Sequence, residues 1–125
     1  MSKDLGLLSE LRFQLAAVRR GFVVSSPSGD NAPYDFVIDN GINLLKVQVK
    51  GTTYTSPDGY FFFQICNGIH KLPYTEGQVD FFALYIEPLR IFFIIPQALL
   101  KGRKAVRINE HGKFKYFKEN WDFST

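Results

Sequence analysis

The chain has 125 residues, of which 46% are hydrophobic and 22% charged, with a formal net charge of +3 at pH 7. This length suits one domain with a single core, and the composition excludes an intrinsically disordered chain. The only cysteine, Cys66, excludes an internal disulfide. No apolar run reaches the roughly 20 residues of a membrane helix, and the first residues lack the cleavage site of a signal peptide. We therefore expect a folded, cytoplasmic (intracellular) protein.

Positive charge is concentrated towards the C-terminus. Seven basic side chains lie between residues 101 and 118 against the single acid Glu110, whereas the first hundred residues hold eight basic and nine acidic ones. A basic end is compatible with a polyanionic partner, and equally with a solvated surface. We interpret residues 102–125 as a basic and aromatic extension of one domain spanning residues 1–125. Its aromatic end is predicted to form either an edge strand or an oligomer contact.

Residues 4–20 are predicted to form an amphipathic helix. Leu8, Leu11, Leu15 and Val18 recur at three- and four-residue steps, which is typical of one face of a helix. We expect this stripe to face the core. Gly21 follows the basic last turn and is a usual signal for the end of a helix.

The remaining pattern predicts a sheet. Asn40-Gly41 is a tight-turn signal that joins two strands into a hairpin, and the following strand is expected to extend this meander. Two later strands are almost wholly apolar, which favours central positions in the sheet. Pro96 is expected to begin a short helix. The predicted strands cover residues 22–25, 34–39, 44–50, 60–65, 81–86 and 91–95.

The hairpin carries polar residues in a suggestive arrangement. Gln48 and Lys50 are two residues apart, so their side chains share one face of the strand. Pairing through the turn would bring Asp35 close to both. The result is an acid, an amide and an amine at one rim of a largely apolar sheet.

Such a set could carry out phosphodiester hydrolysis. Oxygen atoms of Asp35, Gln48 and the Val49 backbone carbonyl suit a hard divalent cation, which would polarise a phosphate and lower the pKa of a bound water. Lys50 could stabilise the attacking hydroxide or the growing charge on the phosphate. Glu10 on the first helix would reach the cation through a water molecule if that helix packs over this face of the sheet. Taken alone, an aspartate such as Asp35 is more often a strand-edge or turn residue, and Glu10 could simply be an exposed helix acid.

In this order, the residues resemble the active-site motif of the PD-(D/E)XK nuclease superfamily. More narrowly, the chain looks like the small group that contains intron-encoded homing endonucleases of bacteria, and it also resembles archaeal Holliday junction resolvases. The segments that carry the resemblance are SEL, RRGF, PSGDNAPYDFVID, LLKVQVKGT, KLPYTEGQVDFFALYIE and IFFIIP, within roughly residues 3–100. The resemblance implies an α/β (α+β) restriction-endonuclease-like core with a mixed four- to five-stranded sheet flanked by helices. It also implies cleavage of duplex or branched DNA with Mg²⁺, or Mn²⁺ as an alternative.

One departure from the superfamily pattern affects the expected activity. Gln48 stands where the superfamily usually has an acid, and a neutral amide binds a cation less strongly than a carboxylate. Three functions therefore stay open: a homing-type endonuclease, which we favour, a Holliday junction resolvase-like nuclease, or a catalytically inactive DNA-binding module. Because so short a chain would need several copies to read a long target, we expect a homodimer or homotetramer with symmetric sites.

Several polar residues around the hairpin and at the basic end are predicted to contact DNA. Some also have structural interpretations, since Asn31 could simply shape its loop and a histidine is often a plain surface residue. The predicted DNA contacts are Ser28, Asn31, Thr52, Gln64, His70, Lys71, Lys101, Arg103 and Lys104.

Overall fold

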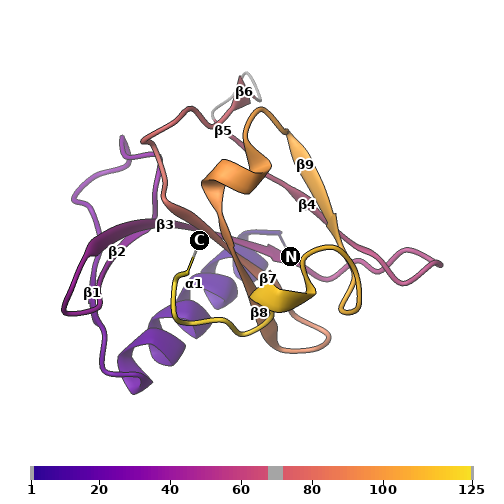
Figure 1. The fold of residues 1–125 in the computed structure, drawn as a ribbon, viewed down its shortest axis with the longest axis horizontal. Helices are drawn as coiled ribbons and strands as arrows, with labels where there is room; N and C mark the ends of the chain where they lie inside the picture. The colour runs from indigo at the N-terminus through magenta and orange to yellow at the C-terminus, as the bar shows by residue number, and fades with distance from the viewer. Residues whose placement is uncertain (1, 68–71, 125) are drawn as a thin grey trace.

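The computed structural model describes residues 2–67 and 72–124, which form one main sheet, one α-helix and smaller elements (Figure 1). The elements are α1 (Ser2–Arg19), β1 (Val23–Ser25), β2 (Phe36–Asp39), β3 (Leu44–Thr52), β4 (Phe61–Gln64), β5 (Cys66–Asn67), β6 (Leu72–Pro73), β7 (Phe81–Ile86), β8 (Ile91–Pro96), the 3-10 helix η1 (Gln97–Leu100), β9 (Ala105–Ile108) and the 3-10 helix η2 (Lys115–Phe117). Among the described residues, no helix is long and apolar enough to cross a membrane.

The main sheet has five strands in the order β1-β2-β3-β7-β8. Strands β3 and β7 run parallel, while the other neighbouring pairs are antiparallel. The sheet is therefore mixed, and the predicted fold class is confirmed. The tight turn between β2 and β3 is also present, and Gly41 in it has a φ of 87°, which glycine adopts without strain.

Each face of the sheet is covered by a different element. Helix α1 covers one face, where Phe13 packs in a cluster with Phe36 and Val47. The β4–β9 ribbon covers the other, where Phe63 packs in a cluster with Phe82. Strand β7 is buried on both faces because it lies between these layers, which explains its continuous apolar sequence.

The prediction that the Leu8–Leu11–Leu15–Val18 stripe faces the core is wrong. Leu11, Leu15 and Val18 are 53%, 52% and 59% exposed, whereas Ser9, Phe13 and Ala17 are buried. The helix lies close to β3, and small side chains such as Ser9 and Ala17 allow that approach. A pattern based on large apolar residues gives no weight to a serine and therefore selects the opposite face.

The prediction that the strand at residues 60–65 extends the meander is also wrong. Strand β4 instead pairs with β9, whose residues carried no strand prediction, and forms a separate two-stranded ribbon. The place beside β3 is taken by β7, in parallel register from Val47–Phe81 to Thr52–Ile86. Alternation along a strand reports which side chains are buried, but it does not specify the neighbouring strand.

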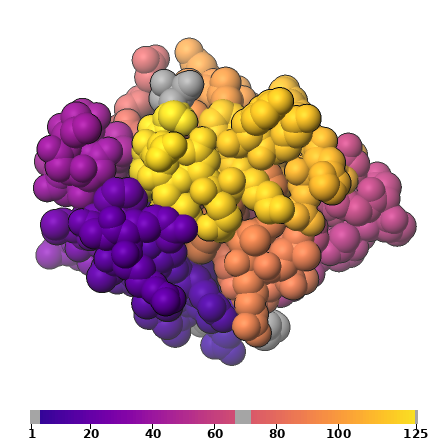
Figure 2. All heavy atoms as spheres, turned by 60° about the horizontal axis from the view of Figure 1, so that its bottom comes forward, coloured from indigo at the N-terminus to yellow at the C-terminus, as the bar shows by residue number. Residues whose placement is uncertain are grey.

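The C-terminal segment covers the free edge of β8, which lies at the edge of the sheet although its sequence predicted a central strand. The Glu119 amide donates to the Phe92 carbonyl (2.7 Å), and the Phe92 amide donates to the Glu119 carboxylate (2.6 Å). Beyond this contact, Trp121 and Phe123 are buried in the cluster under α1, and Figure 2 shows the C-terminal segment beside the helix. The prediction that the aromatic tail forms an oligomer contact is therefore wrong for these two side chains.

Candidate active site

Asp35 lies immediately before β2, where the pairing between β2 and β3 ends. Its amide donates to the Val47 carbonyl (2.9 Å), and its carboxylate Oδ2 accepts a hydrogen bond from the Val49 amide (2.8 Å). The carboxylate is thus held against the backbone of β3 at Val49, which is the residue between Gln48 and Lys50. Because the N–H and C=O groups of a strand residue point to the same edge, the Val49 carbonyl is also directed to this side.

Gln48 and Lys50 project from the face of β3 that is opposite α1. Their neighbours Val47 and Val49 belong to the cluster under the helix, and the side-chain direction alternates along a strand. Both Gln48 and Lys50 are half-buried. Burial raises the pKa of Asp35, and the Val49 amide and the positive charge of Lys50 oppose this rise.

The expectation that the first helix packs over the face of Gln48 and Lys50 is wrong, because α1 covers the other face, but Glu10 still lies beside Asp35. Glu10 and Asp35 line one cavity of about 430 Å³, together with Tyr34 and residues of the loop before β2. Burial and the negative charge of Asp35 raise the pKa of Glu10. Burial also raises the pKa of Asp35, against the lowering effects of the Val49 amide and of Lys50. The two carboxylates therefore carry negative charge that their surroundings do not fully compensate.

The oxygen atoms gathered here fit a hard divalent cation. They comprise the carboxylates of Asp35 and Glu10 and the Val49 carbonyl, with the Gln48 amide oxygen on the adjoining face; such oxygens are the ligands that Mg²⁺ prefers. Across residues 2–67 and 72–124, no group of three acidic, histidine or cysteine side chains forms a metal cluster.

The predicted DNA-contact residues are distributed around this centre. Gln64 and Thr52 line a second cavity, of about 450 Å³, together with Lys50, although Thr52 itself is only 7% exposed. Ser28 and Asn31 are exposed on the loop that borders the Glu10–Asp35 cavity. Lys101, Arg103 and Lys104 are exposed on the segment after η1. The other two predicted DNA contacts, His70 and Lys71, lie outside the described part of the chain.

Two residues at the site were missed by reasoning from the sequence. Tyr74 packs against Phe82, and burial, with a contribution from the charge of Asp35, raises its pKa to about 12, so the phenol stays protonated at neutral pH. Its segment is polar and irregular, so no periodicity pointed to it. Gln14 lines the Glu10–Asp35 cavity. It lies one helical turn after Glu10, and that spacing was a usable signal.

Comparison with known families connects this geometry to an enzyme class. The family model described as PD-(D/E)XK endonuclease matches residues 1–122. The chain belongs to the PD-(D/E)XK endonuclease family. This confirms the resemblance seen in the sequence, and it supports nuclease activity with DNA as substrate in a family that generally depends on divalent metal ions.

A solved structure agrees with this assignment. The PD-(D/E)XK endonuclease described here is similar to the bacterial homing endonuclease I-Ssp6803I, with a TM-score of 0.80 and 25% sequence identity. The match covers 98% of this chain and 89% of the other. A comparison with curated proteins gave no match.

The raised carboxylate pKa values predict that Asp35→Asn stabilises the metal-free endonuclease at neutral pH. Both carboxyls have pKa values above the ordinary 3.8 (Asp35) and 4.5 (Glu10), so their contribution to stability is greatest below those values and is lost as the pH rises through the raised ones. Asparagine keeps an acceptor for the Val49 amide and removes one charge. In EDTA at pH 7 we expect the melting temperature to rise by about 2–4 °C.

Thermal unfolding at pH 4 and pH 7 measures this effect, which should shrink at the lower pH. Asp39→Asn is the matched control, because Asp39 lies at the other end of β2 and accepts a hydrogen bond from the Gly41 amide in the turn. Mg²⁺ should stabilise the wild type more than Asp35→Asn. An unchanged or lower melting temperature of Asp35→Asn in EDTA would contradict the electrostatic account.

Proposed function

We propose that this protein is a divalent-metal-dependent DNA endonuclease of the homing, site-specific type, with Glu10, Asp35, Gln48 and Lys50 as its active site. The observation that carries the proposal is the hydrogen bond from the Val49 amide to the Asp35 carboxylate (2.8 Å), which fixes an acid beside Gln48 and Lys50. Glu10 shares a cavity with this acid. The similarity to a bacterial homing endonuclease over 98% of the chain supports the subtype.

Each residue has a role that follows from its position. Asp35, Gln48 and the Val49 carbonyl would hold Mg²⁺ (or Mn²⁺) directly, and Glu10 would hold it through a water molecule. When bound, the cation polarises the scissile phosphate and lowers the pKa of a water. The Val49 amide keeps Asp35 oriented, and Lys50 places a positive charge where negative charge develops in the transition state.

A magnesium titration of DNA cleavage tests this proposal. We expect the wild type to cleave only with added Mg²⁺ or Mn²⁺, with half-maximal activity at a comparatively high concentration because Gln48 contributes no charge. Gln48→Glu should lower that concentration. Metal-independent nicking that is equal in the wild type and in Asp35→Asn would instead support a DNA-binding module without catalysis, which is the alternative that Gln48 itself favours.

The substrate type is tested by offering a linear duplex library and a four-way junction side by side. Cleavage of a defined duplex sequence supports the homing type, and preferential cleavage of the junction supports a resolvase-like enzyme. We also propose that the protein acts as a homodimer or homotetramer. The outward apolar stripe of Leu7, Leu11, Leu15 and Val18 on α1 is the surface available for this contact, and light scattering should give the mass of two or four chains.

A further inference from the structure

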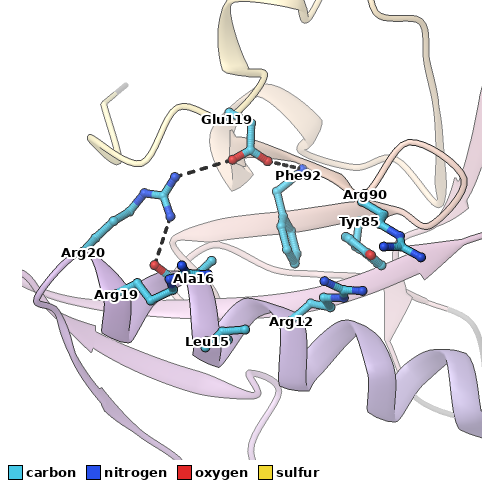
Figure 3. Close-up of a pocket in the computed structure, with 9 residues that line it drawn as sticks. All are labelled: Arg12, Leu15, Ala16, Arg19, Arg20, Tyr85, Arg90, Phe92 and Glu119. Carbon is cyan, nitrogen blue, oxygen red and sulfur yellow. Dashed lines mark hydrogen bonds and ion pairs between the residues drawn. The ribbon is translucent and has the colours of Figure 1, made fainter.

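A second concave site lies on the other flank of helix α1. This cavity, of about 410 Å³, is bounded by α1, by β7 and β8 and by the C-terminal segment. Arg12 lies two residues after Glu10, so it points about 200° away around the helix, and the cavity is separate from the active site. Figures 2 and 3 show the helix, the C-terminal segment and the β7–β8 region meeting here.

The cavity is lined by four arginines. Arg20 is paired with Glu119 (3.6 Å) and donates to the Ala16 carbonyl (3.0 Å). For Arg12, Arg19 and Arg90, the described residues provide no carboxylate within salt-bridge distance. Glu119 is the one acidic residue lining the cavity among the described residues, and it is also occupied by the Phe92 amide and the Trp121 indole. The cavity therefore has an excess of positive charge.

Tyr85 places an uncharged donor among these charges. Its side chain is 1% exposed, and its hydroxyl and Glu87 Oε2 are both buried without a hydrogen bond of normal geometry among the described residues. Burial raises the pKa of Tyr85 to about 12, and interaction with the neighbouring Glu87 carboxylate contributes, so the hydroxyl is protonated at neutral pH and has this carboxylate beside it as an acceptor. Figure 3 shows the guanidinium groups of Arg12 and Arg90 near this phenol. A buried donor without a well-formed hydrogen bond is costly, so a phosphate oxygen could accept a hydrogen bond from this phenol in competition with Glu87.

The backbone of Arg90 gives an independent indication. Arg90 has a φ of 55° in the β7–β8 turn, where its amide donates to the Ile86 carbonyl (2.7 Å). Glycine and asparagine adopt this left-handed conformation more easily than arginine. Arginine therefore stands at a turn position that suits other residues better, as Glu119 and Phe123 also do, and its side chain lines the cavity. Strained residues of this kind concentrate at functional sites.

We propose that this cavity, which we name the arginine pocket (Arg12, Arg19, Arg20, Arg90, Tyr85 and Glu119), binds a phosphate group. Guanidinium groups bind phosphate through paired, charge-assisted hydrogen bonds, and a phenol adds a further donor. The phosphate could belong to a DNA strand or to free phosphate or a nucleotide. The proposal does not depend on the nuclease site, since it concerns binding on the opposite flank of α1.

The test uses inorganic phosphate and the full chain. Binding is measured from the rise in melting temperature and from NMR shifts of the arginine side chains, against chloride at equal ionic strength. Arg90→Asn should weaken phosphate binding about tenfold, the effect of losing one charge-assisted hydrogen bond. Because asparagine suits the turn, this variant should melt no lower than the wild type in chloride. Tyr85→Phe should weaken binding without changing the charge.

Lys113→Gln is the matched control, because it removes one positive charge from an exposed residue that does not line the pocket. Equal phosphate responses in the wild type, Arg90→Asn and Lys113→Gln would overturn the proposal, as would no response of the wild type beyond that to chloride. A second arm measures binding to duplex DNA as a function of salt. A salt dependence reduced by about one counterion in Arg90→Asn identifies a DNA phosphate as the ligand, and an unchanged one identifies free phosphate or a nucleotide.

Discussion

Replacing Lys50 by alanine should lower the rate of DNA cleavage at saturating DNA and Mg²⁺ by about 10²–10³-fold, the usual effect of removing one preorganised group that stabilises transition-state charge. Lys50 is half-buried on β3 and lies near enough to Asp35 for its charge to lower the pKa of that carboxyl. The strand fixes its position before substrate arrives, so little reorganisation is needed during the reaction.

The Lys50→Ala variant should also change a property that can be measured without substrate. Because Lys50 lowers the pKa of Asp35, its removal should move that pKa further upwards, which carboxyl ¹³C NMR can follow in metal-free protein. Single-turnover cleavage of the same duplex gives the rate. An unchanged pKa of Asp35 would mean that the ammonium group does not lie where the structure places it.

Lys46→Ala is the matched control for Lys50→Ala. Lys46 lies on the same strand and the same face, but its Nζ donates to the Gly77 carbonyl. Its loss should change the cleavage rate by no more than about threefold, as is usual for surface substitutions. If both variants lost activity equally, positive charge along the strand would matter more than the position of Lys50, and the assigned role would be wrong.

Replacing Gly51 by alanine should lower the free energy of unfolding by about 1–3 kcal/mol, the range for overfilling a packed contact. A methyl group at Gly51 would lie 2.1 Å from Ser9 Oγ and 3.3 Å from Leu5 Cγ. Ser9 Oγ has little freedom to move, because Ser9 is buried and its hydroxyl donates to the Leu5 carbonyl (2.7 Å). The helix would have to move away from β3 and carry Glu10 with it, so cleavage should fall as well.

Chemical denaturation of a small set of variants tests this contact. Adding Ser9→Ala to Gly51→Ala removes the closest atom and should restore much of the lost stability, since residues in direct contact do not act additively. Gly6→Ala is the control, because a methyl group there meets nothing within 4 Å, and alanine should stabilise the helix by roughly 0.5–1 kcal/mol. A Gly51→Ala variant as stable as the wild type would show that α1 does not pack so closely on β3.

Much of the candidate site could be predicted from the sequence because its geometry is local. The alternation of Val47, Gln48, Val49 and Lys50 determines which side chains share a face, and the Asn40-Gly41 turn fixes the register that brings Asp35 opposite them. Glu10 could be proposed only on a condition about the packing of the first helix, because its distance from Asp35 depends on how a helix packs on a sheet. Tyr74 was missed for the same reason.

The sequence by itself determined the helix, the order of the site residues and the family. It also determined where the strands of the main sheet lie along the chain, but not which strands pair with one another. The tertiary structure alone decided which side of α1 faces the sheet, that β7 lies beside β3, that β4 pairs with β9, and that the C-terminal segment covers β8. The physical reason is that periodicity records the burial of each residue along its own element. Which element provides that burial depends on close contacts between distant residues, such as Ser9 against Gly51, that no local pattern contains.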